Sequence, residues 1–250
     1  MMKKIVLTFV LVTMYVVAGA QTINVAAAAN LRYVMEEIKT AYLRSNPKSK
    51  INIVYGSSGT LTQQISNGAD FDLFMSADDE FPLALKKKAL TYGPMHIYAY
   101  GKLALYSTSV DVRRKGLAVL SEPGVKKIAI CNPITAPYGK RSVELMSSHG
   151  MYGPLKSKIV VADNISQAAQ YAFTGNADVA FVALSLTLTP EMKAKGNTYI
   201  FSQKLYTPIR QGCILIKRGA VNTGASKFMK YFLSPVTKNI WESFGYSLPE

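Results

Sequence analysis

Residues that commonly carry catalysis are scarce in this sequence. Its 250 residues include two cysteines and two histidines, and the histidines, His96 and His149, lie far apart along the chain. No pair of carboxylates flanks a plausible site, and there is no Walker loop, dinucleotide fingerprint, GxSxG elbow or CxxC motif. Enzyme classes that depend on these groups are therefore disfavoured.

The two cysteines are too few for a disulfide scaffold. Cys131 ends an apolar, strand-like run at 128–131, and Cys213 begins another at 213–216. This placement favours buried free thiols. An oxidising compartment would also permit one bond between them, and the sequence leaves that alternative open.

Long apolar runs are equally scarce, and the only prominent one lies at the N-terminus. Lys3 and Lys4 precede an apolar run from Ile5 to Val17, and Ala18-Gly19-Ala20 follows it with the small-x-small form of a cleavage site. The run is short for a bilayer span, and no Cys for lipid attachment stands at the cleavage site. We therefore predict a signal peptide over 1–20 and an exported, soluble mature chain from about residue 21.

Acidic residues are few relative to basic ones. Without Lys3 and Lys4 the chain keeps 27 basic residues against 15 acidic ones, a formal charge of +12. The basic residues are scattered, with only short runs such as 86–88 and 113–115, and no basic stripe interleaved with aromatic residues is present. Nucleic acid is therefore not the expected partner, and the charge either attracts small anions or aids solubility.

Strand-like and helix-like patterns alternate along the first part of the chain. Apolar strand patterns at 23–29, 51–54 and 71–75 are each followed by a helical pattern, and Asn30 fits the N-cap position of the first helix. Such alternation predicts a parallel sheet whose loops gather at one edge.

The same alternation returns after a longer strand predicted at 97–106, where we place a crossing into a second lobe. Further strands are predicted at 128–131, 159–162 and 178–183, and a strand at 211–217 would cross back. The predicted division is lobe I at 21–98 and 213–250, and lobe II at 99–212. Two mostly parallel α/β lobes joined in this way have a ligand cleft between them, which the strand-to-helix loops face.

The loop at 55–60 carries the clearest indication of a site. It joins a strand to a helix, and it holds hydroxyls at Ser57, Ser58 and Thr60 but no Lys or Arg. Helix N-termini present free N–H groups and the positive end of the helix dipole, so an anion is the natural occupant. Ordinary helix capping is the alternative reading. A serine nucleophile at Ser58 is a third, but the sequence offers no base to activate it.

Several motifs resemble, in order and over essentially the whole mature chain, the periplasmic molybdate-binding proteins of ABC importers, the ModA family. These motifs are Ala27–Leu31, Gly56–Leu61, Asp72–Asp78, Asn132-Pro133 with Pro137–Gly139, and Gly175–Ala180. The resemblance implies a two-lobed class II binding-protein fold that closes on a tetrahedral oxyanion, without enzyme activity or cofactor. It also implies a periplasmic monomer that serves a membrane permease and its ATPase.

By position, the resemblance implies that Asn30, Ser58, Ala77, Tyr138 and Ile165 form the ligand site. Asn30 replaces a donor serine of other members and Ser58 matches the second-loop serine. The positions of Tyr138 and Ile165 supply backbone N–H groups, and Ala77 borders the pocket. No residue is expected to ligate the metal atom directly, because the oxyanion's own oxygens face the protein.

One position departs from the family pattern. Many members carry a tyrosine, whose hydroxyl binds the anion, where this chain has Ala183. The Tyr138 hydroxyl is one candidate replacement and an Asn30 side-chain N–H is another, while Tyr138 as a mere aromatic lid is the alternative. The missing hydroxyl leaves open which oxyanion is preferred.

A pocket of N–H and O–H donors suits a fully deprotonated tetrahedral dianion. Monoprotonated phosphate would bring a hydrogen that finds no acceptor, and sulfate is smaller. We therefore expect molybdate, with tungstate poorly distinguished from it. The alternatives are a relative retuned to sulfate or chromate and, from another class, an exported hydrolase that uses Ser58.

Overall fold

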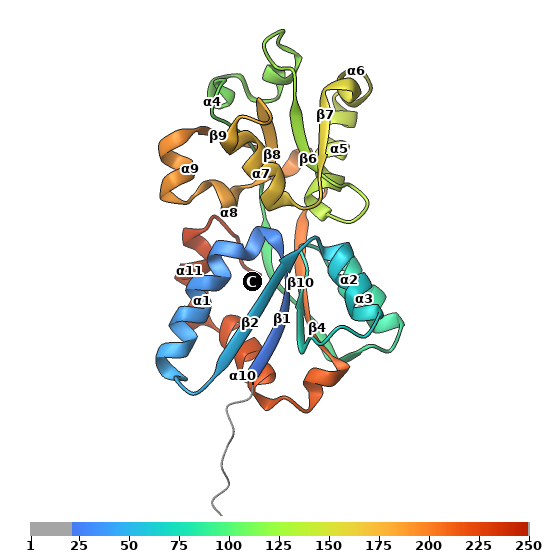
Figure 1. The fold of residues 1–250 in the computed structure, drawn as a ribbon, viewed down its shortest axis with the longest axis vertical. Helices are drawn as coiled ribbons and strands as arrows, with labels where there is room; N and C mark the ends of the chain where they lie inside the picture. Colours follow the sequence, from blue (N-terminus) through green and yellow to red (C-terminus); the bar gives the residue numbers. More distant parts are fainter. Residues whose placement is uncertain (1–21, 250) are drawn as a thin grey trace, which may run out of the picture.

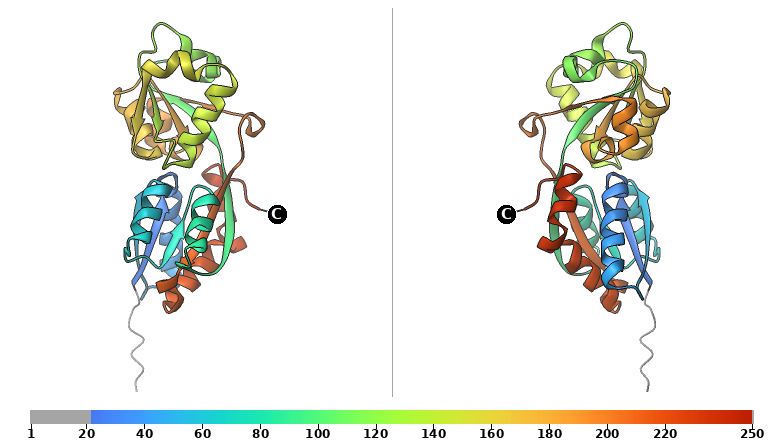
Figure 2. Two further views of the ribbon diagram at one scale, coloured as in Figure 1. Left: turned by 90° about the vertical axis from the view of Figure 1, so that its right-hand side faces the viewer. Right: turned by 90° about the vertical axis from the view of Figure 1, so that its left-hand side faces the viewer.

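Two stacked lobes make up the molecule, each a five-stranded sheet flanked by helices (Figures 1 and 2). The structure is a computed structural model that describes residues 22–249. The predicted signal peptide at 1–20 lies outside the described residues. Within 22–249, none of the helices combines the length and apolar character that crossing a membrane requires.

The first lobe contains both ends of the described chain. Its sheet has the order β2-β1-β3-β10-β4, with bounds β1 (Thr22–Ala28), β2 (Lys50–Gly56), β3 (Leu73–Met75), β4 (Thr91–Gly101) and β10 (Ile209–Ile216). Its helices are η1 (Ala29–Leu31), α1 (Arg32–Ser45), α2 (Ser58–Ser66), α3 (Glu80–Lys87), η5 (Lys217–Ala220), α10 (Thr223–Phe232), η6 (Pro235–Thr237) and α11 (Lys238–Ser243).

The second lobe is a continuous insertion between β4 and β10. Its sheet has the order β7-β6-β8-β5-β9, with bounds β5 (Leu103–Ser107), β6 (Ile128–Cys131), β7 (Ile159–Ala162), β8 (Val179–Ala183) and β9 (Asn197–Ile200). Its helices are α4 (Val112–Lys115), η2 (Gly116–Ser121), α5 (Pro137–Ser148), α6 (Tyr152–Leu155), η3 (Lys156–Lys158), α7 (Ile165–Thr174), α8 (Leu184–Thr187), α9 (Pro190–Lys195) and η4 (Gln203–Leu205).

The predicted two-lobed α/β fold is confirmed, and its sheets are mixed. In the first lobe β1 pairs in parallel with β2 and β3, whereas β10 pairs antiparallel with β3 and β4. In the second lobe β6 pairs in parallel with β7 and β8, whereas β5 pairs antiparallel with β8 and β9. The parallel strands carry fully buried small and branched residues such as Val25, Ala26 and Ala27. Because their carboxyl ends point towards the other lobe, the loops that follow them meet between the lobes (Figure 1).

The single strand predicted at 97–106 is wrong, because the chain changes sheets within it. β4 ends at Gly101 and β5 begins at Leu103, so Lys102 is the crossing point. Gly101 lies so close to the Tyr138 hydroxyl and to Gln211 that a side chain there would overlap both. The predicted lobe boundaries at 98/99 and 212/213 fall inside β4 and β10, since these strands stay paired from Gly101 opposite Ile209 onward.

Both cysteines are free and buried in the structure. Cys131 belongs to the sheet of the second lobe and Cys213 to that of the first. Burial raises the pKa of the Cys131 thiol to about 12, so it stays protonated at neutral pH. The buried-thiol interpretation therefore holds, and the structure contains no bond between the two residues.

Candidate functional site

A small cavity between the lobes contains every residue that the sequence predicted for the site. Its volume is about 10 Å³, far below the roughly 300–1,000 Å³ of pockets that take drug-sized ligands. Its lining consists of Ala28, Ala29, Asn30, Gly56, Ser57, Ser58, Ala77, Ala136, Pro137, Tyr138 and Ile165. None of these side chains is charged, so the cavity suits a small ligand held by neutral groups.

Helix N-termini from both lobes converge on this cavity. Ser58 begins α2, Pro137 begins α5 and Ile165 begins α7, while Ala29 and Asn30 belong to the short η1 that precedes α1. The first N–H groups of a helix have no acceptor within it, and they carry the positive end of its dipole. The cavity is thus electropositive without any cationic side chain.

The start of α2 leaves two donors for a ligand. The Ser57 side chain accepts a hydrogen bond from the Thr60 N–H at 3.4 Å, and the Gly59 N–H donates to Thr135 O of the other lobe at 2.7 Å. The Ser58 side-chain oxygen accepts from the Ala77 N–H at 3.0 Å, so its own hydrogen stays available. Ser58 can therefore offer both its N–H and its O–H.

Ala77 has an indirect part in this arrangement. It lines the cavity, but its N–H is engaged by Ser58. The residue is therefore not a free donor and instead fixes the direction of the Ser58 hydroxyl. The resemblance placed Ala77 at the pocket, and in the structure it lines the cavity with its N–H on the Ser58 side chain.

The second lobe contributes backbone donors from α5 and α7. The Asn164 side chain caps α7 by accepting from the Ser166 and Gln167 N–H groups at 3.0 and 3.1 Å. The Ile165 N–H, at the first position, is left without an acceptor in its own helix. Tyr138 stands one residue after Pro137, which has no N–H, so the Tyr138 N–H is the first donor of α5.

Asn30 does not cap a helix, contrary to the sequence prediction. It lies inside η1, and neither η1 nor α1 has a side-chain cap. Its side-chain nitrogen instead lies 2.9 Å from Gln211 Oε1 and 2.9 Å from the Tyr246 hydroxyl. Long-range partners outweigh the local cap here because Asn30 is buried and must find its hydrogen bonds inside the protein.

The Tyr138 hydroxyl faces β4 and β10, the two strands that lead from the first lobe to the second and back. Its oxygen lies 3.3 Å from Gln211 Nε2 and beside Gly101, and neither of those residues lines the cavity. Ala183 is fully buried at the end of β8 and is also not part of the lining. Sequence reasoning missed Gln211, Tyr98 and Tyr246, although a glutamine in an otherwise apolar strand was a signal of a buried polar contact.

The lobes touch across the cavity, which shows a closed arrangement. Ser166 Oγ donates to Ala29 O at 2.8 Å and Ser185 Oγ donates to Asn30 O at 2.9 Å. At the surface, Lys140 and Glu80 form an exposed ion pair at 2.9 Å, a kind of contact worth only about 0–1 kcal/mol. The cavity is therefore enclosed mainly by backbone and hydroxyl contacts.

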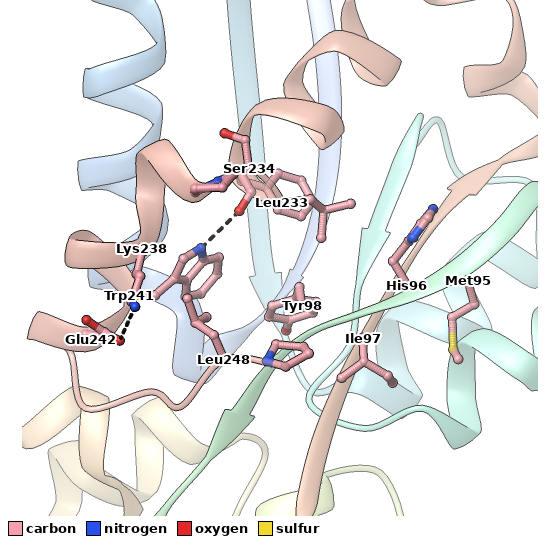
Figure 3. A pocket seen from close by; sticks show the side chains of 13 residues that line it. Met95, His96, Ile97, Tyr98, Leu233, Ser234, Lys238, Trp241, Glu242 and Leu248 are labelled. Carbon is pink, nitrogen blue, oxygen red and sulfur yellow. Dashed lines mark hydrogen bonds and ion pairs between the residues drawn. The ribbon is translucent and has the colours of Figure 1, made fainter.

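A wider groove lies elsewhere on the first lobe (Figure 3). It runs between β4 and the C-terminal helices, and its lining includes Tyr98, Trp241 and Leu248. Its lining includes the charged side chains of Lys238 and Glu242, and none of the residues that the sequence indicated for the site is part of that lining. Size alone therefore does not make it the candidate site.

Comparisons with known proteins agree over nearly the whole chain. The profile of the bacterial extracellular solute-binding proteins matches residues 23–247. The chain is 34% identical to the molybdate-binding protein ModA of Azotobacter vinelandii over 92% of each chain. It is also 34% identical to ModA of Rhodobacter capsulatus, over 92% of this chain and 89% of the relative.

The fold comparison gives the same result. The solved structure of the periplasmic molybdate-binding protein of Azotobacter vinelandii superimposes with a TM-score of 0.85 at 30% identity, covering 91% of this chain and all of that one. The predicted resemblance is therefore confirmed, and this chain belongs to the ModA family of bacterial extracellular solute-binding proteins.

Proposed function

We propose that this protein captures molybdate or tungstate between its lobes and delivers it to the permease and ATPase of an ABC importer. The observation that carries the proposal is the cavity itself. Backbone and hydroxyl donors from both lobes converge there, and no charged side chain lines it. Such a set of donors matches a fully deprotonated tetrahedral oxyanion, whose oxygens only accept hydrogen bonds.

The proposed ligand set consists of Asn30, Ser58, Tyr138 and Ile165, with Ala77 acting through Ser58. The sequence also predicts a signal peptide and a monomeric state. We therefore propose that the protein is periplasmic and acts as a monomer. Similarity to two curated molybdate-binding relatives at 34% identity supports the choice of ligand.

The hydrolase alternative fails on its chemistry. The Ser58 side-chain oxygen is engaged by the Ala77 N–H, and the cavity lining contains no His, Asp, Glu or Lys that could act as a base. Family membership agrees, because this is a family of binding proteins. Ser58 is therefore a hydrogen-bond donor in our proposal and not a nucleophile.

A thermal-shift panel tests the proposal directly. Molybdate, tungstate, sulfate, phosphate and chromate are each added to the mature protein at the same concentration. A ligand present at about 100 times its Kd stabilises the folded state by about 2.7 kcal/mol. We expect large, similar shifts with molybdate and tungstate. A larger shift with sulfate or chromate would favour the retuned relative, and no shift with any oxyanion would contradict oxyanion capture altogether.

Replacing Ser58 with alanine is expected to weaken molybdate binding by about 1.5–3 kcal/mol, because a donor to a charged acceptor is lost in an enclosed site. Isothermal titration calorimetry measures the change. Ser66→Ala, at the far end of α2, is the matched control, since it removes a hydroxyl whose partner is the exposed Lys88. Equal affinity of the Ser58 variant and the parent protein would remove Ser58 from the ligand set.

A further inference from the structure

A buried network connects Asn30 to the strands that join the lobes. Asn30 and Gln211 are 1% and 0% exposed. Both hydrogens of the Asn30 side-chain nitrogen are used, by Gln211 Oε1 and by the Tyr246 hydroxyl, each at 2.9 Å. Asn30 Oδ1 has no partner among the described residues. In this arrangement the only Asn30 side-chain atom left for a ligand is an acceptor.

In that arrangement the Tyr98 hydroxyl has two acceptor oxygens within hydrogen-bond distance and only one hydrogen. The Tyr98 oxygen lies 2.8 Å from Ser76 O and 2.9 Å from Gln211 Oε1, but a hydroxyl carries one hydrogen. Burial raises the Tyr98 pKa well above its usual value, so the hydroxyl stays neutral. One of the two oxygen pairs is therefore in contact without a hydrogen between them.

Turning the Gln211 amide by 180° removes this conflict. Its nitrogen then donates to both Tyr98 and Asn30, and the Tyr98 hydrogen goes to Ser76 O. The Tyr138 hydroxyl, 3.3 Å from the other Gln211 amide atom, then donates to the Gln211 oxygen. The Asn30 amide must turn as well, because two nitrogens would otherwise face each other. The Asn30 nitrogen then becomes the free atom, and the side chain offers a donor in place of an acceptor.

The second arrangement moves the conflict to Tyr246. The Tyr246 oxygen lies 3.0 Å from Asn30 O, 3.1 Å from Ser185 Oγ and 2.9 Å from the Asn30 side-chain atom that would then be an oxygen, and its one hydrogen can serve only one of these contacts. Tyr98 therefore favours the arrangement in which Asn30 offers the ligand an N–H, the donor arrangement. Tyr246 favours the arrangement in which Asn30 offers its oxygen, the acceptor arrangement. Gln211 couples the two ends, since neither amide can turn alone.

We propose that Gln211 is a positioning residue that sets which atom of Asn30 meets the ligand, with Tyr98 and Tyr246 biasing it in opposite directions. This inference rests on the proposed oxyanion function. A deprotonated oxyanion selects the donor arrangement, whereas a protonated oxyanion such as hydrogen phosphate can donate to the acceptor. The amide pair thus contributes to the choice between these two classes of anion.

Two tyrosine variants test the inference. For each, calorimetry gives the Kd for molybdate, and competition against molybdate gives the Ki for inorganic phosphate. Tyr98→Phe removes support for the donor arrangement, so molybdate binding should weaken about threefold to tenfold. Tyr246→Phe removes the hydroxyl that stabilises the acceptor arrangement, so the affinity for molybdate should stay the same or increase. The ratio of phosphate Ki to molybdate Kd should fall in the first variant and rise or hold in the second.

Tyr106→Phe is the control, because it deletes an equally buried hydroxyl that donates to Met192 O in the second lobe. Thermal unfolding without ligand reports any loss of stability. A parent protein that does not bind molybdate would contradict the proposed function. If the parent protein binds molybdate but the Tyr98 and Tyr246 variants shift the affinity in the same direction, the positioning role of Gln211 would be contradicted.

Discussion

Replacing Ile165 with proline is expected to remove high-affinity oxyanion binding while the protein stays folded. Proline has no N–H, and its ring carbon occupies the place where that hydrogen met the ligand. The loss should exceed about 3 kcal/mol, because a donor to a charged acceptor disappears and an apolar group takes its position. Calorimetry with molybdate measures the effect.

The position of Ile165 makes this substitution compatible with the fold. It is the first residue of α7, where proline is well tolerated, and Asn164 before it is extended with φ −149° and ψ 171°. Ile165→Val is the matched control, since it keeps the N–H and nearly the same apolar side chain. Circular dichroism verifies folding. A folded proline variant with parental affinity would show that this N–H does not bind the anion.

Substitution of Gly59 by alanine should raise Kd for molybdate by about a hundredfold, close to 3 kcal/mol, by opposing closure of the lobes. A Cβ on Gly59 would lie 2.8 Å from Thr135 Cα and 3.0 Å from Thr135 Cβ, across the gap between lobes. The backbone of Thr135 cannot move aside as a flexible side chain could. The closed state, with its Gly59 N–H to Thr135 O bond at 2.7 Å, is therefore penalised.

The unliganded protein should respond in the opposite direction. Gly59 is in the first turn of α2, and alanine is favoured over glycine in helices by roughly 1 kcal/mol at most. Stability without ligand should thus hold or rise while affinity falls. Gly153→Ala is the control, because a Cβ at Gly153 meets no atom within 4 Å. Similar affinities for the Gly59 variant and the parent would mean that this contact is not part of the ligand-bound state.

Local patterns in the sequence were sufficient to indicate the main elements that surround the site. Small polar residues between an apolar run and a helical pattern marked the start of α2 at Ser58. These signals are local, because a helix N-terminus depends on the capping residues next to it. Family resemblance then selected the particular positions.

Other features depended on contacts between residues far apart in the chain. The division of 97–106 into β4 and β5 has no local turn signal, because it arises from the different sheets with which the two halves pair. Ala77 donates its N–H to Ser58, a partner 19 residues away that no local pattern indicates. Such contacts follow from packing and cannot be read from spacing alone.

The sequence by itself determined the family, the two-lobed architecture and five of the positions that line the cavity, because these follow from local pattern and motif order. Only the tertiary structure decided how the polar atoms of those positions are used. Asn30 meets Gln211 and Tyr246, which lie 181 and 216 residues further along the chain. A buried amide takes whatever partners the packed lobes bring to it, and folding alone determines which residues those are.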